Sequence, residues 1–325
     1  IGSFVNIADE RIKAKVTESL DDNVLCPPPL IQFNPNFQYG ESMSELITEL
    51  NLHPHLSNIF RGFHLYQHQE DAIRLGQKNM DFVVTSGTGS GKSVTFLANI
   101  FDYVLKNPGK GIKAVLVYPM NALINSQKEE LNKFEENCKR YADSFGISFA
   151  KYSGQEGEKE RLSVKEDLPD IILTNYMMLE LIMTREGESG MRESMAKDMK
   201  FLVFDELHTY KGRQGADVAF LIRRIRANCM KDLLCIGTSA TMSSGKGSIN
   251  EQKKEVAQFA NKIFGKSFTE HSIINETIVP LTKISGDIVD ANDMKNCILK
   301  GVNFNSGEGE ISNNAIVQWL ENKVG

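Results

Sequence analysis

The chain has 325 residues, of which 41% are hydrophobic and 24% charged, ordinary values for a globular protein able to bury a sizeable core. Its formal net charge of −5 argues against a protein that coats nucleic acid through bulk positive charge. Any binding of nucleic acid must therefore use a local surface. The cysteines are scattered without a CxxC pair, no apolar run could span a bilayer and no signal peptide is visible, which predicts a cytoplasmic protein with neither a disulfide framework, a zinc or iron–sulfur site nor a membrane partner.

The first 60 residues contain many residues that break regular structure, among them the run Pro27-Pro28-Pro29. A short helix is expected from Glu41 to Leu50. We therefore predict an N-terminal extension, residues 1–60, packed on the domain that follows.

Short runs of branched apolar residues then alternate with helix-length segments. Continuous apolarity is typical of strands buried on both faces, and strand–helix alternation predicts an α/β fold with a mostly parallel central sheet flanked by helices. The expected strands cover residues 82–84, 114–117, 171–173, 201–204 and 233–236, and the expected helices include residues 93–105, 122–141 and the segment after Gly215. We assign residues 61–268 to this domain. Residues 269–325, with an expected helix from Asn313 to Asn322, are assigned to a C-terminal connector or cap segment.

A glycine-rich loop lies between the first expected strand and the first long helix, the context in which such a loop binds phosphate. Its backbone N–H groups would converge on phosphate oxygens, Lys92 would carry charge to the β- and γ-phosphates, and the Ser93 hydroxyl would ligate Mg²⁺. The strict GxxxxGK[ST] pattern wants glycine where this chain has Ser86, and a glycine-rich turn without a ligand is the alternative. We expect ATP and Mg²⁺ at Ser86, Gly87, Thr88, Gly89, Ser90, Gly91, Lys92 and Ser93.

An acidic pair, Asp205-Glu206, follows the apolar run at residues 201–204. The carboxyl end of a buried strand is the edge where open α/β sheets bind ligands. Asp205 would hold Mg²⁺ through water, and Glu206 would orient and deprotonate the water that attacks the γ-phosphate. Taken alone the pair could be a solvated strand end; its place downstream of the phosphate loop favours a catalytic pair that acts with Lys92.

These motifs resemble, in order, motifs I, II and III of DExH-type superfamily 2 helicases, with Ser239-Ala240-Thr241 as the third, and the resemblance covers about residues 60–265. Residues 65–73 resemble the Q motif, which implies that Gln69 reads the adenine. The resemblance also implies that His208 faces the γ-phosphate and that Ser239, Ala240 and Thr241 couple the nucleotide edge to a partner domain. Ser239 and Thr241 could otherwise be ordinary turn residues.

Residues 118–123 resemble motif Ia, and residues 152–154 and 173–179 resemble the nucleic-acid-contacting segments that follow it. The resemblance implies that single-stranded nucleic acid contacts Pro119, Asn121, Ser153, Gly154, Thr174 and Asn175, although Asn121 could merely cap a helix beginning at Ala122. Residues 205–218, with Arg223-Arg224 after them, are similar to the YprA/MrfA-like bacterial group, which includes DrmA-like subunits of defence systems.

The resemblance implies a RecA-like P-loop domain that binds ATP and Mg²⁺ and moves on a single strand, DNA rather than RNA. Nothing after Thr241 resembles motifs IV to VI, so we expect a fragment whose second RecA-like domain, with its arginine finger, lies in a longer protein or in another chain. Such a finger is worth about 10³ to 10⁵ in rate, so the chain alone should hydrolyse ATP weakly. An RNA helicase, or a nucleotide-gated nucleic-acid-binding subunit of a defence or repair complex, are the alternatives.

Overall fold

The computed structural model describes residues 9–12, 14–15, 36–87, 89–240, 248–279, 291–300 and 314–324. They divide between two compact units. The smaller unit takes its residues from the two ends of the chain and contains two helices that pack against each other, α12 (Ala291–Lys300) and α14 (Ala315–Val324). The larger unit spans Phe37–Val279 and contains the predicted sheet.

A seven-stranded sheet forms the centre of the larger unit, in the order β4-β5-β3-β6-β7-β2-β8. Every neighbouring pair is parallel. All five predicted strands are present, and the predicted α/β fold is therefore confirmed. The strands are β2 (Phe82–Thr85), β3 (Ala114–Tyr118), β4 (Phe149–Lys151), β5 (Ile171–Asn175), β6 (Phe201–Phe204), β7 (Leu234–Ser239) and β8 (Ile273–Asn275).

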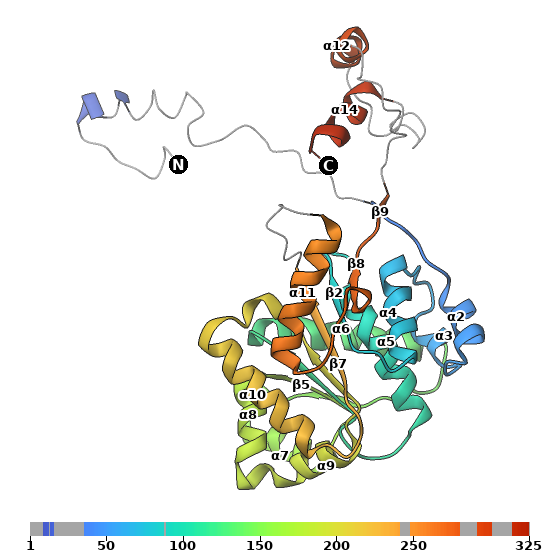
Figure 1. Ribbon diagram of the computed structural model, residues 1–325, viewed down its shortest axis with the longest axis vertical. Helices are drawn as coiled ribbons and strands as arrows, with labels where there is room; N and C mark the ends of the chain where they lie inside the picture. Colours follow the sequence, from blue (N-terminus) through green and yellow to red (C-terminus); the bar gives the residue numbers. More distant parts are fainter. Residues whose placement is uncertain are drawn as a thin grey trace. The chain divides into compact units, whose positions relative to one another are not determined.

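Helices cover both faces of the sheet, because side chains along each strand alternate between two buried clusters. In β3, for example, Ala114 and Leu116 face one cluster, whereas Val115 and Val117 face the other. The first face packs against α2 (Met43–Leu50), α3 (Leu56–Ile59), α4 (Gln67–Gln77), α5 (Lys92–Lys106) and α6 (Asn121–Lys139). The second packs against α7 (Glu158–Asp167), α8 (Tyr176–Thr184), α9 (Ser189–Asp198), α10 (Gly212–Asn228) and α11 (Ile249–Phe264) (Figure 1).

Three short 3₁₀ turns and two short strands complete the described elements. They are η1 (Glu186–Glu188), η2 (Leu207–Thr209), η3 (Glu270–Ser272), β1 (Asn36–Phe37) and β9 (Ile278–Val279). No helix among the described residues combines the length and apolarity that a membrane span requires.

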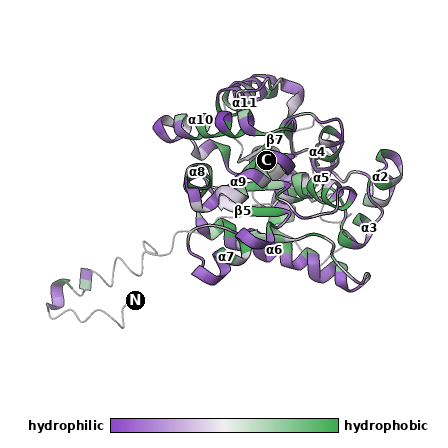
Figure 2. Cartoon of the chain, turned by 90° about the horizontal axis from the view of Figure 1, so that it is seen from below, coloured by the Kyte–Doolittle hydropathy of each residue, from purple (hydrophilic) through white to green (hydrophobic). Residues whose placement is uncertain are grey.

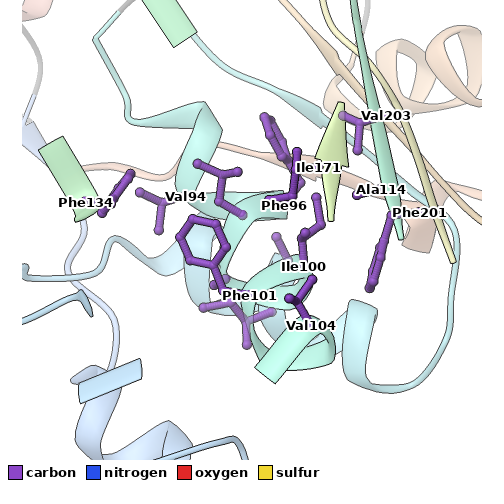
Figure 3. Packing of buried hydrophobic residues seen from close by; sticks show 14 of the residues in the cluster. Val94, Phe96, Ile100, Phe101, Val104, Ala114, Phe134, Ile171, Phe201 and Val203 are labelled. Atoms are coloured by element: carbon purple, nitrogen blue, oxygen red, sulfur yellow. The ribbon is translucent and has the colours of Figure 1, made fainter. Parts of the chain in front are cut away.

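Helix α5 lies against the sheet and fixes the direction of the loop before it. Its residues Phe96, Ile100 and Val104 point into the same core as Ile171 and Phe201 of the strands (Figure 3). In Figure 2 the green hydrophobic colour is concentrated on the strands and on the inner sides of such helices. Because this core is close-packed, α5 holds its first turn, and with it the phosphate loop, at the sheet edge.

The larger unit extends beyond the predicted domain limits of 61–268. At its start, α2 and α3 bury Met43, Leu46, Leu56 and Ile59 in the first core cluster. At its end, β8 adds an edge strand beside β2. Strands β4 and β8 have only three residues each, and β4 is half-buried, so neither forms a continuous apolar run. Residues 1–8, 13 and 16–35 of the predicted extension lie outside the described part of the chain.

A buried ion pair offers a test of the fold. Lys113 Nζ lies 2.5 Å from Asp170 Oδ1, and Asp170 Oδ2 accepts hydrogen bonds from the backbone N–H and hydroxyl of Ser148. Removing one partner of such a pair leaves an uncompensated charge, so Asp170→Ala should lower the free energy of unfolding by about 3–5 kcal/mol in urea denaturation.

The matched control for this prediction is Glu135→Ala, which breaks the more exposed ion pair with Lys139. That variant should lose less than about 1 kcal/mol, because exposed pairs contribute little. Equal losses of unfolding free energy in the two variants would contradict the prediction that the buried Lys113–Asp170 pair stabilises the fold more than the exposed pair.

Candidate nucleotide-binding site

The phosphate loop joins β2 to α5 and is shaped by two glycines with positive φ, Gly89 (φ 83°) and Gly91 (φ 68°). The positive φ of Gly91 favours glycine, and a Cβ there would lie 2.5 Å from Gln69 Nε2, so the Gln69 amide would have to move away from the loop. The Ser86 and Ser90 hydroxyl oxygens lie 2.6 Å apart and share a hydrogen bond across the loop. Serine at position 86 therefore has a structural role in this loop.

Lys92 brings the two halves of the predicted site together. Its Nζ lies 3.4 Å from Glu206 Oε1 and 3.3 Å from the Ser86 carbonyl oxygen, to which it donates. The two charged residues are far apart in the sequence, and the parallel sheet places the ends of β2 and β6 at one edge. Thr88, the remaining predicted residue of this loop, lies outside the described residues.

Asp205 is half-buried beside the end of β7. Its Oδ1 accepts a hydrogen bond from the Thr238 hydroxyl, whose oxygen also accepts one from the Glu206 backbone N–H. Burial raises the pKa of the Asp205 carboxyl, and the hydrogen bond from Thr238 opposes that rise. A cation would offset the cost of burying this carboxylate. Ser93, which donates to Gln127 Oε1 at 3.0 Å, supplies a second oxygen, and such oxygen donors fit Mg²⁺.

Glu206 connects the acidic segment to the end of β7. It adopts the left-handed conformation (φ 51°, ψ 53°), which is uncommon for a residue with a side chain and is found at functional sites. Its Oε2 accepts from the Ala240 backbone N–H at 3.3 Å and lies 3.2 Å from His208 Nδ1. His208 Nδ1 is also 3.2 Å from the Ser239 hydroxyl. Glu206, His208, Ser239 and Ala240 are thus in contact, and Thr241 lies outside the described residues.

Gln69 and its neighbour His68 hold the phosphate loop from α4. Gln69 Nε2 donates to the carbonyl oxygens of Gly91 (2.9 Å) and Ser90 (3.3 Å), and its Oε1 accepts from the Tyr66 backbone N–H. His68 Nε2 lies 2.9 Å from the Ser90 carbonyl oxygen. Both ends of the Gln69 amide therefore bind the chain itself, and its contact with adenine stays a prediction.

Three residues predicted to contact a single strand lie together at the ends of β3, β4 and β5. The Asn175 amide donates to Asn121 Oδ1 at 2.9 Å and to the Ser153 carbonyl oxygen at 3.2 Å. Half-buried Pro119 lies just before Asn121. The cap of α6 is Met120, and no side-chain hydrogen bond is made there, so the capping alternative for Asn121 is wrong.

The two other residues predicted for this edge differ in accessibility, because Thr174 is buried whereas Gly154 is exposed. The Thr174 hydroxyl is fully buried and donates to the Tyr152 carbonyl oxygen at 2.7 Å. Gly154 (φ 89°) donates its N–H to Glu156 Oε2 at 2.9 Å, and the Ser153 hydroxyl donates to the other carboxylate oxygen at 2.6 Å. Thr174 thus holds the segment that contains Ser153 and Gly154 through the Tyr152 backbone, whereas Asn121 and Asn175 lie at the sheet edge.

Sequence reasoning missed three residues that hold the site. Thr238 positions Asp205, Gln127 accepts from the Ser93 hydroxyl, and His68 contacts the loop backbone. Thr238 directly precedes the predicted coupling motif, and His68 precedes Gln69. Their positions next to predicted site residues were a weak indication that they belong to the site. Gln127 lies within the predicted helix 122–141 and in none of the motifs, so nothing in the sequence indicated its contact with Ser93.

Comparisons with known proteins agree with this geometry. The DEAD/DEAH box helicase family model matches residues 66–247, more than half of the chain. The uncharacterized ATP-dependent helicase MJ1574 of Methanocaldococcus jannaschii is 28% identical over 267 residues, which cover 80% of this chain and 34% of that protein. The Druantia protein DruE of Escherichia coli is 26% identical over 382 residues, covering 81% and 20%.

A solved structure of the helicase MrfA bound to DNA and AMPPNP has a TM-score of 0.60 to this chain at 22% identity, covering 81% of this chain and 34% of that one. At that identity the likeness shows the fold alone, which is the RecA-like fold. The chain spans about a third or less of the length of the relatives it matches.

Proposed function

The chain belongs to the DEAD/DEAH box helicase family, and from that premise we propose that it is the first motor domain of an ATP-dependent DNA helicase or translocase. The observation that carries the proposal is the 3.4 Å approach of Lys92 Nζ to Glu206 Oε1, which joins the phosphate loop to the acidic pair at one sheet edge. A cation and a carboxylate so placed are the parts that ATP hydrolysis requires.

In this proposal the loop from Ser86 to Ser93 binds the phosphates of ATP through its backbone N–H groups and Lys92. Ser93 and Asp205 hold Mg²⁺, which, when bound, neutralises charge on the phosphate oxygens. Glu206 orients the attacking water and accepts its proton. Its contacts with His208 and Ala240 link this water site to the end of β7.

Hydrolysis coupled to movement is proposed for a longer assembly that includes a second RecA-like domain. The arginine finger expected from that domain accounts for about 10³ to 10⁵ in rate. DNA is favoured because MrfA, which shares the fold, was solved with DNA. RNA remains the second candidate, because the DEAD-box helicase Mss116, solved with single-stranded RNA, also shares the fold, with a TM-score of 0.58 at 17% identity.

Strand binding can be tested at Asn121. Asn121→Ala should weaken binding of a fluorescent single-stranded DNA about tenfold, because it removes a polar contact and frees the Asn175 amide from its partner. The affinity is measured by anisotropy with a non-hydrolysable ATP analogue present, and a single-stranded RNA of the same sequence tests the second candidate.

The control variant is Asn228→Ala, at the exposed last residue of α10 and shortly before β7 begins, which should leave strand affinity unchanged. If Asn121→Ala binds as tightly as the control variant, the proposed strand edge is wrong. Tighter binding of RNA than of DNA by the wild-type chain would favour the RNA helicase.

A further inference from the structure

A carboxylate of the chain itself binds the phosphate loop. Glu276, the residue after β8, accepts a hydrogen bond through Oε2 from the Gly87 backbone N–H at 2.8 Å. Backbone N–H groups in a glycine-rich loop before a helix are anion ligands. One of the donors of the loop is thus already satisfied by an internal anion.

The sheet places Glu276 there. Strands β2 and β8 are parallel, with Thr85 opposite Asn275, so the next residues of the two strands are Ser86 and Glu276. The Thr85 hydroxyl donates to Asn275 Oδ1 at 2.7 Å and holds the two strand ends together. The contact with the loop therefore follows from strand register and from a neighbouring hydrogen bond.

The charge of Glu276 has little compensation apart from the loop. Within the described residues, no lysine or arginine lies within ion-pair distance of this half-buried carboxylate. Lys92, the cation of the loop, is paired with Glu206 instead. A second anion beside Gly87 would be repelled by Glu276, because like charges at close range in a partly buried site disfavour each other.

We propose that Glu276 competes with the phosphates of ATP for the phosphate loop, so that it lowers nucleotide affinity and favours nucleotide release. The inference rests on the proposed function, since it requires that the loop bind ATP. Glu276 lies outside the segment matched by the family model and outside every motif used above. Its proposed role is to compete with the phosphates of ATP for the Gly87 backbone N–H.

The test compares Glu276→Gln with a matched control, Glu270→Gln. The glutamine side chain keeps the size and the hydrogen-bond acceptor of Glu276 but loses the charge, so this variant should bind ATP about tenfold more tightly than the wild type. Its affinity for adenosine, which lacks phosphates, should not change. Glu270 lies six residues earlier, its carboxylate is 3.6 Å from Lys254 Nζ, and its variant should bind ATP as the wild type does.

Affinities are measured by isothermal titration of the wild-type and variant chains with ATP and Mg²⁺, and with adenosine. Glu276→Ala, which also removes the charge, should give a similar gain in ATP affinity. Unchanged or weaker ATP binding by both Glu276 variants would overturn the proposal, as would an equal gain in Glu270→Gln. A wild-type chain that binds no ATP at all would contradict the proposed function itself, and this inference with it.

Discussion

Replacement of Lys92 by alanine is expected to weaken ATP binding about 100-fold or more, to a level that titration calorimetry does not detect. The Lys92 ammonium lies at the first turn of α5, within 3.3 Å of the Ser86 carbonyl oxygen, and is the cation that the loop offers to phosphate. Charge-assisted hydrogen bonds are roughly twice as strong as neutral ones, and the ammonium would make them to two phosphates.

The control for this prediction is Lys110→Ala. It removes the same charge from an exposed lysine in the turn between α5 and β3. It should bind ATP as the wild type does. Thermal unfolding of the two variants without nucleotide should be similar, because within the described part of the chain Lys92 makes one ion pair, with Glu206, in a partly exposed site. Retention of micromolar ATP binding by Lys92→Ala would show that the loop does not act as a phosphate site.

The fold could be predicted because its signals are local. Five of the seven strands are continuous apolar runs, since strands at the centre of a parallel sheet are covered on both faces. The edge strands β4 and β8 were missed because each has only three residues and, in β4, all three are half-buried. The family model confirms the resemblance to superfamily 2 helicases, and the fold agrees with it. The resemblance could be detected because the motifs stand in their usual order along the chain.

The site was predictable only in part, and the reason is physical. Asp205 directly follows an apolar run, and Lys92 and Ser93 follow a glycine-rich loop that comes after another such run, so their positions at the sheet edge follow from local pattern. The contacts of Thr238 with Asp205 and of Glu276 with Gly87 join segments that are distant in the sequence. Such contacts depend on strand order and register, which no short segment encodes.

Glu206→Gln should separate ATP binding from hydrolysis. The amide keeps the shape of the side chain, and its oxygen can still accept from the Ala240 backbone N–H, but it cannot accept a proton from water. In the longer protein that carries the second domain, turnover stimulated by single-stranded DNA should fall by about 10² to 10⁴. The control Glu158→Gln, at the exposed start of α7, should keep full turnover.

ATP binding by Glu206→Gln should be equal to that of the wild type or tighter. In the wild type, Glu206 Oε1 lies 3.4 Å from Lys92 Nζ and competes with phosphate for that ammonium. Removing the carboxylate charge frees Lys92, so the same change that stops hydrolysis does not weaken the phosphate site. Unchanged turnover in Glu206→Gln would refute its assignment as the base. A wild-type protein that binds ATP without strand-stimulated turnover would instead favour a nucleotide-gated binding subunit, in which Glu206 and Lys92 form a switchable ion pair.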